Sequence, residues 1–113
     1  MADCLFCKIA AKELDAEVVW ESDGALAFKD INPAAPTHVL VIPKKHIASA
    51  SELGADDAAL VLEMFEGMRR IASDAGLDGG HRIVTNVGPD AGQSVHHLHF
   101  HVLGGRSMSW PPG

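Results

Sequence analysis

The spacing of apolar residues along the chain separates one helical segment from several extended ones. Between residues 55 and 75, apolar side chains recur every three to four positions, the spacing of one helix face, at Leu60, Val61, Met64, Met68, Ile71, Ala72 and Ala75. Arg69 and Arg70 stand near the expected end, as the helix dipole favours, and Gly76 occupies a common position for a left-handed cap. The pattern predicts a long helix over 55–75.

Short runs of apolar and β-branched residues, each bounded by turn formers, predict strands. Residues 18–21 and 25–30 flank the turn sequence Ser-Asp-Gly and predict a hairpin. Residues 37–43 are mostly apolar and end at a proline, which predicts a central strand, and residues 81–86 predict another. A last strand is expected to follow the loop 88–92 and to run to about Leu103.

A short helix is predicted over residues 4–11, with Asp3 as its N-cap and Leu5, Phe6 and Ile9 on its apolar side. The order of elements favours the α+β class: an antiparallel five-stranded sheet with one long and one short helix, in a single domain over 1–113. One long helix covers only one face of such a sheet. A partner subunit is therefore expected to cover the other.

Histidines occupy every second position of the last predicted strand, at His97, His99 and His101, with Leu98 and Phe100 between them. Alternate side chains of a strand point to opposite faces, so the three imidazoles would share one face. Imidazole can act as nucleophile, acid, base or metal ligand near neutral pH, and this predicts a functional site. Three interpretations follow from the residues alone: a metal-buffering tract, a catalytic metal site, or nucleophilic catalysis.

Charge narrows the range of partners. Nine basic residues against fifteen acidic ones give a net charge of −6, which argues against nucleic acid as a partner and leaves a small anionic ligand. The N-terminus lacks the basic start and apolar run of a signal peptide, and no stretch approaches a membrane span. We therefore expect a cytoplasmic protein without a membrane partner.

The segment His97 to Leu103 is similar to the H-φ-H-φ-H-φ-φ signature of the histidine triad (HIT) superfamily. Further segments resemble the nucleotide-binding (Hint) branch in the same order: 28–33, 35–38, 41–46, 92–95, 104–106 and the terminal Trp-Pro-Pro-Gly of 110–113. His96 departs from that pattern, since a tyrosine commonly stands there. The resemblance implies a purine nucleoside phosphoramidase that hydrolyses the P–N bond of adenosine or guanosine phosphoramidates through a nucleotidyl-histidine. It also implies a homodimer whose sheets join into one.

Two other functions stay open. One is a nucleotide-binding regulatory scaffold, in which the dimer binds AMP or GMP and a protein partner. The other is dinucleoside polyphosphate hydrolysis, which belongs to a sister branch, and the Trp-Pro-Pro-Gly tail argues against it.

The resemblance also implies roles for individual residues. His99 is the expected nucleophile, His97 orients it, and His101 contacts the phosphate. Gln93 and Ser94 are expected to supply N–H groups for the phosphate oxygens, and the Ser94 hydroxyl to assist the departing amine. The expected substrate-binding residues are Asp30 for the ribose, Phe28, Ile31 and Leu40 for the purine, and Asn86, Gly92, Gln93, His38 and Trp110 around them. Phe28, Ile31 and Leu40 could equally be part of the hydrophobic core.

Cys4 and Cys7 form a C-x-x-C pair, the only cysteines of the chain. From the residues alone they could hold zinc together with histidines, form a redox disulfide, or be inert and buried. Some bacterial-type HIT proteins and the related galactose-1-phosphate uridylyltransferases combine such a pair with two histidines, which correspond here to His46 and His97. The resemblance therefore implies a structural zinc that is not required for the chemistry.

Overall fold

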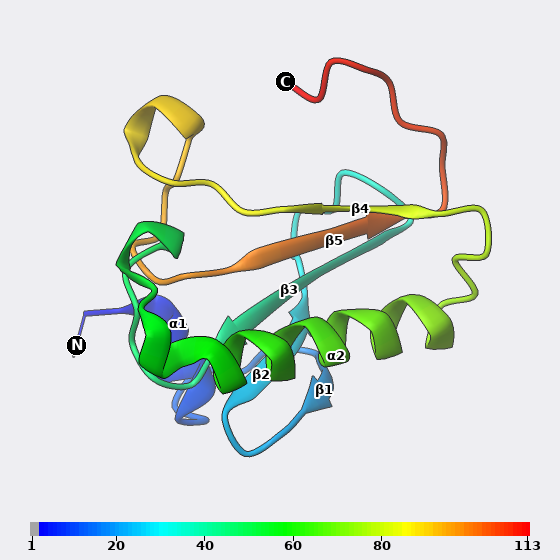
Figure 1. Ribbon diagram of the computed structural model, residues 1–113. Helices are drawn as coiled ribbons and strands as arrows, with labels where there is room; N and C mark the ends of the chain where they lie inside the picture. Colours follow the sequence, from blue (N-terminus) through cyan, green and yellow to red (C-terminus); the bar gives the residue numbers. More distant parts are fainter. Residues whose placement is uncertain (1–2) are drawn as a thin grey trace.

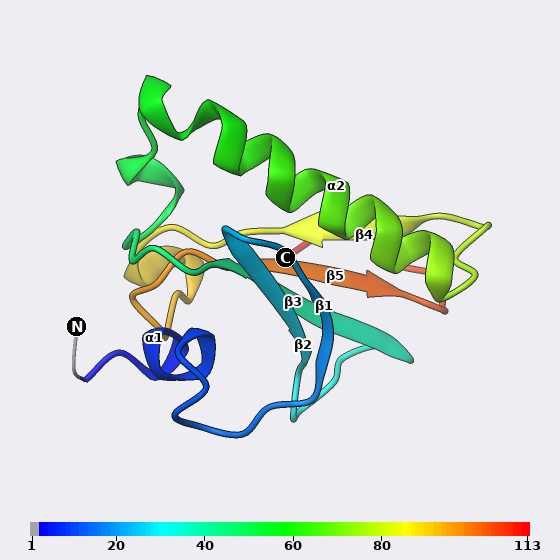
Figure 2. The same cartoon turned by 90° about the horizontal axis from the view of Figure 1, so that it is seen from below.

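Five antiparallel strands form a single sheet with a helix on each face (Figures 1 and 2). The computed structural model describes residues 3–113. The strands are β1 (Val18–Glu21), β2 (Ala25–Lys29), β3 (Thr37–Pro43), β4 (His81–Val84) and β5 (Phe100–Gly104), in the spatial order β1-β2-β3-β5-β4. The predicted α+β architecture, with five strands, one long helix and one short helix, is confirmed.

The long helix, α2 (Ala58–Asp74), covers one face of the sheet (Figure 2). It begins three residues later than predicted, because residues Ala55–Asp57 form a turn of 3-10 helix. The Asp57 carboxylate holds this turn by accepting from the Gly54 N–H at 3.0 Å and from Lys45 at 2.9 Å. Met64, Met68 and Ile71 of the helix pack on alternate residues of the strands, and Gly76 takes the expected left-handed conformation (φ 68°). This packing forms the larger of the two cores.

The short helix α1 (Leu5–Ala10) covers part of the opposite face, which was expected to need a partner subunit. Its Phe6 and Ile9 are buried against a second core, formed by Leu26, Phe28, Leu40 and Ile42. The prediction that Asp3 caps this helix is wrong. Cys4 is the N-cap, and its sulfur accepts from the Cys7 N–H at 3.3 Å, because the Cys4 side chain lies over the free N–H groups of the first turn.

The prediction that all three triad histidines lie on one strand is wrong, because β5 begins only at Phe100. Ahead of it, the chain is held by bonds outside the ladder. The Leu98 N–H donates to the Ile47 carbonyl at 2.6 Å, and the Thr85 hydroxyl donates to the His99 carbonyl at 2.8 Å. The last strand pair shortens likewise, with β4 ending at Val84 instead of residue 86.

The alternation of faces nevertheless persists through this irregular stretch. Leu98, Phe100 and Val102 belong to the core under α2. The rings of His97 and His99 point to the other face, where both make T-shaped contacts with the Phe6 ring. Extended backbone therefore separates the two sets of side chains even where the ladder bonds are missing. Among the helices of residues 3–113, none combines the length and apolarity that crossing a membrane requires.

Candidate functional site

The three triad histidines lie together at the end of β5 that faces α1. His97 is fully buried, His99 is 7% exposed, and His101 is half-buried. The ring centroids of His99 and His101 are 5.1 Å apart. The structure thus brings His97, His99 and His101 into one row, as the spacing indicated, although only His101 lies within a strand.

The proton position on His99 is set by the main chain. Its Nδ1 lies 2.7 Å from the carbonyl oxygen of His97, and a carbonyl can only accept, so Nδ1 carries the hydrogen. A neutral imidazole has one N–H, which leaves Nε2 with a free lone pair. This is the form in which a histidine can attack an electrophile.

His97 is fixed at both ring nitrogens. Its Nε2 donates to the carbonyl of Pro43 at 2.8 Å, so its Nδ1 is unprotonated and faces the two cysteines. Burial, the largest cause, lowers the pKa of His97 and keeps the ring neutral. A neutral histidine with its second N–H bound to a carbonyl is the usual arrangement of a metal-ligating histidine.

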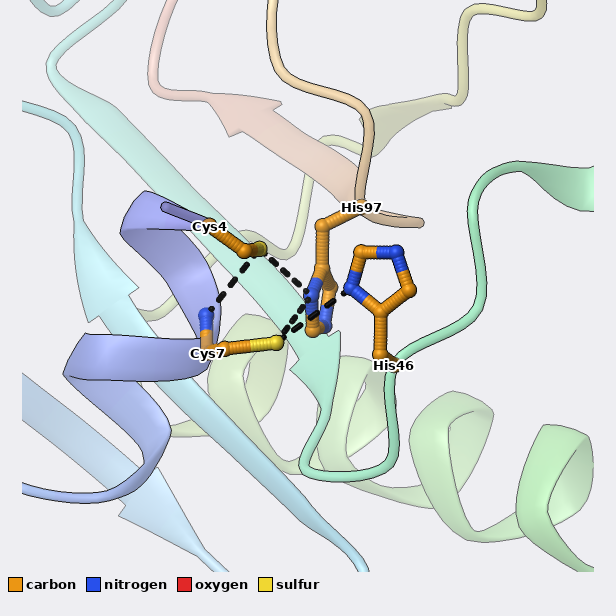
Figure 3. A group of neighbouring side chains, drawn as sticks. All are labelled: Cys4, Cys7, His46 and His97. Atoms are coloured by element: carbon orange, nitrogen blue, oxygen red, sulfur yellow. Dashed lines mark hydrogen bonds between the residues drawn. The ribbon is translucent and has the colours of Figure 1, made fainter. Parts of the chain in front are cut away.

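Cys4, Cys7, His46 and His97 converge from three separate parts of the chain (Figure 3). Their four ligand atoms all lie within 4.8 Å of one another. The sulfur-to-nitrogen distances are 3.3 Å for Cys4–His97, 3.3 Å for Cys7–His46 and 3.5 Å for Cys7–His97. A tetrahedral zinc ion with its usual bond lengths would separate sulfur and nitrogen ligands by about 3.5 Å.

The chemistry of this donor set also suits a cation. Burial and then the neighbouring Cys4 raise the pKa of the Cys7 thiol to about 11, so a bound cation would be needed to hold Cys7 as a thiolate at neutral pH. The four residues form a structural zinc site. A zinc ion held there would tie α1 to the loop after β3 and to the triad.

A second group of polar side chains extends the row past His101. His38, on β3, has its Nε2 at 2.9 Å from His101 Nδ1 and at 3.4 Å from an Asp30 carboxylate oxygen. The Ala34 N–H donates to His38 Nδ1 at 3.0 Å. Burial, followed by the charges of His99 and His38, lowers the pKa of His101 to about 4, so that ring is neutral at pH 7. The structure therefore brings Asp30 and His38 beside the triad.

The turn before the triad corrects one expectation. The Gln93 N–H, expected to serve the substrate, already donates to the Gly88 carbonyl at 3.1 Å. The buried Gln93 side chain holds the turn, since its amide accepts from the Gly88 N–H and donates to the carbonyls of Ala48 and Val95. Ser94 is exposed, and within residues 3–113 its N–H donates to no protein acceptor. Ser94 thus stays available, while Gln93 acts on the shape of the turn.

The residues expected around the substrate fall into two groups. Phe28 and Leu40 are buried, 5% and 6% exposed, on the same face as the triad. By contrast, Ile31 is 92% and Trp110 is 82% exposed. Asn86 is half-buried two residues after β4, and Gly92 (φ 82°) ends the 3-10 helix Pro89–Ala91.

Phe6 is a site residue that the sequence did not indicate. Its ring stands edge-on to His99 at 5.1 Å, to His97 at 6.0 Å and to Phe28 at 5.5 Å. The sequence pattern indicates only that Phe6 is an apolar position of the short helix. The available signal was its place between Cys4 and Cys7, two ligands of the metal site.

The surface has two hollows, of about 630 and about 440 Å³. The larger borders the end of α2 and the segment after β5, and the smaller borders Asp30 and His38 together with Ile71 of α2. Neither is lined by a triad histidine. The triad itself lies along the sheet surface beside α1.

The chain is similar in sequence and structure to several known proteins. A family model described as the C-terminal binding region of the scavenger mRNA decapping enzyme matches residues 3–110. An uncharacterised HIT-like protein of Synechococcus elongatus is 49% identical over 98% of this chain and 97% of its own length. A 14 kDa zinc-binding protein of Zea mays is 45% identical over 96% and 87% of the two chains. The crystal structure of a HIT family hydrolase from Legionella pneumophila superposes with a TM-score of 0.96, at 50% identity over 98% of this chain and 100% of that one.

Proposed function

The chain belongs to the histidine triad (HIT) family and is a hydrolase of that family, and from this premise we propose that it cleaves the P–N bond of purine nucleoside 5′-phosphoramidates. The observation that carries the proposal is the fixed proton of His99. With Nδ1–H bound to the His97 carbonyl, the Nε2 lone pair is free for attack on phosphorus. The geometry supports nucleophilic catalysis over a catalytic metal, because the zinc ligands include only one triad residue, His97.

The reaction would proceed in two displacements. His99 Nε2 attacks the α-phosphorus, a P–N bond to histidine forms, and the bond to the amine breaks. The departing amine takes a proton from the exposed Ser94 hydroxyl, which regains one from solvent. Water then attacks the same phosphorus, its proton leaves, and the bond to His99 breaks. The products are a nucleoside monophosphate and the free enzyme.

Substrate recognition would use the polar and apolar parts of the same face. We assign the ribose hydroxyls to Asp30, a double acceptor beside His38, and the phosphate to His101 and the Ser94 N–H. Phe28 and Leu40 would form the floor of the purine site, with Ile31 at its exposed lip. Phe6 would complete the wall, since its ring touches both His99 and Phe28.

A comparison of two substrates tests this function. Purified protein would receive adenosine phosphoramidate and diadenosine polyphosphate at equal concentrations, with release of AMP measured for each. Faster turnover of the phosphoramidate by at least tenfold is expected. Preference for the polyphosphate would assign the chain to the other reaction, and binding of AMP without turnover of either substrate would support the scaffold role.

We also propose that the protein works as a homodimer. Leu62 and Phe65 of α2 are 60% and 42% exposed, and Ile83 of the edge strand β4 is 38% exposed. Ile83 pairs with Val102, so it faces the same side of the sheet as α2. An apolar helix face next to an open strand edge favours a second copy that continues the sheet. Sedimentation at micromolar concentration tests this, and a monomer would refute it.

A further inference from the structure

We propose that the main-chain N–H of Ala34 is a positioning group of the active site, which sets the protons of His101 by acting through His38. The proposal rests on the proposed function, in which His101 binds the substrate phosphate. Ala34 itself is exposed and lies in the loop between β2 and β3. Nothing in its side chain marks it as functional.

The first step is the proton of His38. The Ala34 N–H donates to His38 Nδ1 at 3.0 Å. A nitrogen that accepts a hydrogen bond carries no hydrogen, and a neutral imidazole has a single N–H. The hydrogen of His38 must therefore be on Nε2. A main-chain amide cannot reverse its role, so this choice is permanent as long as the loop keeps its shape.

The second step passes this choice to His101. The Nε2–H of His38 faces His101 Nδ1 at 2.9 Å, with the Asp30 carboxylate as a more distant acceptor at 3.4 Å. His101 Nδ1 is then the acceptor, which places the hydrogen of His101 on its own Nε2. One peptide N–H thus orders the protons of two histidines in succession.

The third step is the consequence for the ligand. An Nε2–H on His101 can donate to a phosphate oxygen, whereas the other tautomer would present a lone pair to an anion. His101 is neutral at pH 7 because burial depresses its basicity, so it has only one hydrogen to give. The position of that hydrogen then decides whether His101 attracts or repels the phosphate.

The same N–H has a second effect, on metals. Asp30, His38 and His101 hold three ligand atoms within 4.8 Å of one another, which is a spacing that a divalent ion could use. A metal on His38 Nε2 would move the hydrogen to Nδ1, directly against the Ala34 N–H. At the cysteine cluster the arrangement is the opposite, since the second nitrogen of His97 faces the Pro43 carbonyl. The Pro43 carbonyl thus favours a metal at the cysteine cluster, and the Ala34 N–H disfavours a metal on His38.

Replacing Ala34 with proline removes the N–H and tests the proposal. Ala34→Ser keeps the N–H and is the matched control. In Ala34→Pro we expect nitrogen NMR to show a changed tautomer for His101, and kcat for adenosine phosphoramidate to fall tenfold or more. Titration with Co²⁺, after the cysteine site is filled, should reveal one further equivalent bound. Ala34→Ser should match the wild type in all three.

Adding His38→Gln to Ala34→Pro provides a rescue, because the side-chain amide nitrogen of glutamine can donate to His101 without an N–H at residue 34. Part of the lost kcat should return. A folded Ala34→Pro with unchanged His101 shifts and kcat within twofold of wild type would overturn the proposal.

A measurement on the wild-type protein tests the proposal even if Ala34→Pro does not fold. Ring-nitrogen shifts should show His38 protonated at Nε2 and not at Nδ1, and the reverse would also overturn the proposal. Inactivity of the wild type toward phosphoramidates would refute the proposed function, while leaving this tautomer measurement intact.

Discussion

The main-chain carbonyl of His97 accepts a hydrogen bond from Nδ1 of His99 across 2.7 Å. The same residue faces Cys4 and Cys7 with its ring, so His97 serves the zinc site with its side chain and the proposed nucleophile with its backbone. Burial of the His97 ring at 0% exposure leaves little freedom for either contact. The metal site and the reacting nitrogen are thus joined through one peptide unit.

Removing the His99 ring should abolish turnover and spare binding. In His99→Ala no other triad nitrogen has the free, outward lone pair that attack needs, so phosphoramidate hydrolysis should fall at least a thousandfold, as expected for loss of a nucleophile. AMP binding by calorimetry should remain within about tenfold, because the ribose and purine contacts lie elsewhere. Near-normal hydrolysis by His99→Ala would show that another group is the nucleophile.

The purified chain should contain one zinc per molecule on Cys4, Cys7, His46 and His97, measured by elemental analysis. Folding free energy should depend on the metal, because a six-residue helix alone is unstable in water. A chelator should therefore lower the melting temperature by several degrees, and Cys4→Ser should lower it similarly without the chelator. Ser73→Ala at an exposed position of α2 is a suitable control. Less than about 0.2 equivalents of zinc after purification without chelators would contradict the assignment.

Acid should destabilise the fold between about pH 6.5 and pH 4. The pKa of His101 is about 4 in the folded protein, against an ordinary value of 6.5. The unfolded chain therefore binds this proton first as the pH falls, and each unit in this window costs at most about 1.4 kcal/mol. Denaturant unfolding at several pH values should show a shallower decline for His101→Asn than for wild type. Equal slopes would mean that His101 titrates normally when folded.

Gly67 of α2 should not tolerate a methyl group. A Cβ at this position would lie 2.6 Å from two carbon atoms of the Trp20 ring, so the helix could not keep its distance from β1. We expect Gly67→Ala to lower the free energy of unfolding by about 1–3 kcal/mol, despite a gain in helix propensity of about 1 kcal/mol. Urea denaturation measures the difference. Glu66→Ala on the exposed side should be nearly neutral, and Trp20→Leu should restore part of the loss in Gly67→Ala.

Deleting residues 110–113 should change substrate preference more than stability. Trp110 is 82% exposed within its own chain, so its removal loses little packing. Arg82 would still bind Ser109, whose carbonyl oxygen becomes part of the new C-terminal carboxylate, and so anchor the remaining tail. We expect a shift of the melting temperature below about 2 °C and a clear change in relative kcat/KM for different leaving amines. A large fall in stability with unchanged selectivity would instead make the tail a structural element.

Local periodicity predicted most of the secondary structure. The bounds of β3 match the predicted strand 37–43, and the hairpin and α2 differ by one to three residues. The start of β5 was missed because it depends on contacts between distant segments, such as the bond from Leu98 to Ile47. The bond from the Gln93 N–H to the Gly88 carbonyl was missed for a different reason, because it depends on the exact shape of the local turn around the 3-10 helix Pro89–Ala91.

Some residues of the candidate site could likewise be predicted from the sequence, and others could not. Spacing alone grouped His97, His99 and His101, and the family resemblance added His46, Asp30 and His38. Neither indicated that Phe6 would meet the His99 ring, because that contact depends on how α1 is docked. Sequence patterns report which face a side chain occupies, while docking decides what it touches.

The order in which the ribosome releases the zinc ligands follows from their places in the chain. Cys7 and His97 lie 90 positions apart. Val41 of β3 pairs with Phe100, which is synthesised roughly sixty residues later, so that part of the sheet cannot form before then. Both thiols are therefore exposed without the fourth ligand for most of the time of synthesis, and His46 joins them before its middle. A nascent chain in this state is open to oxidants and to other soft metals, and this exposure ends only when the last fifth of the protein has emerged.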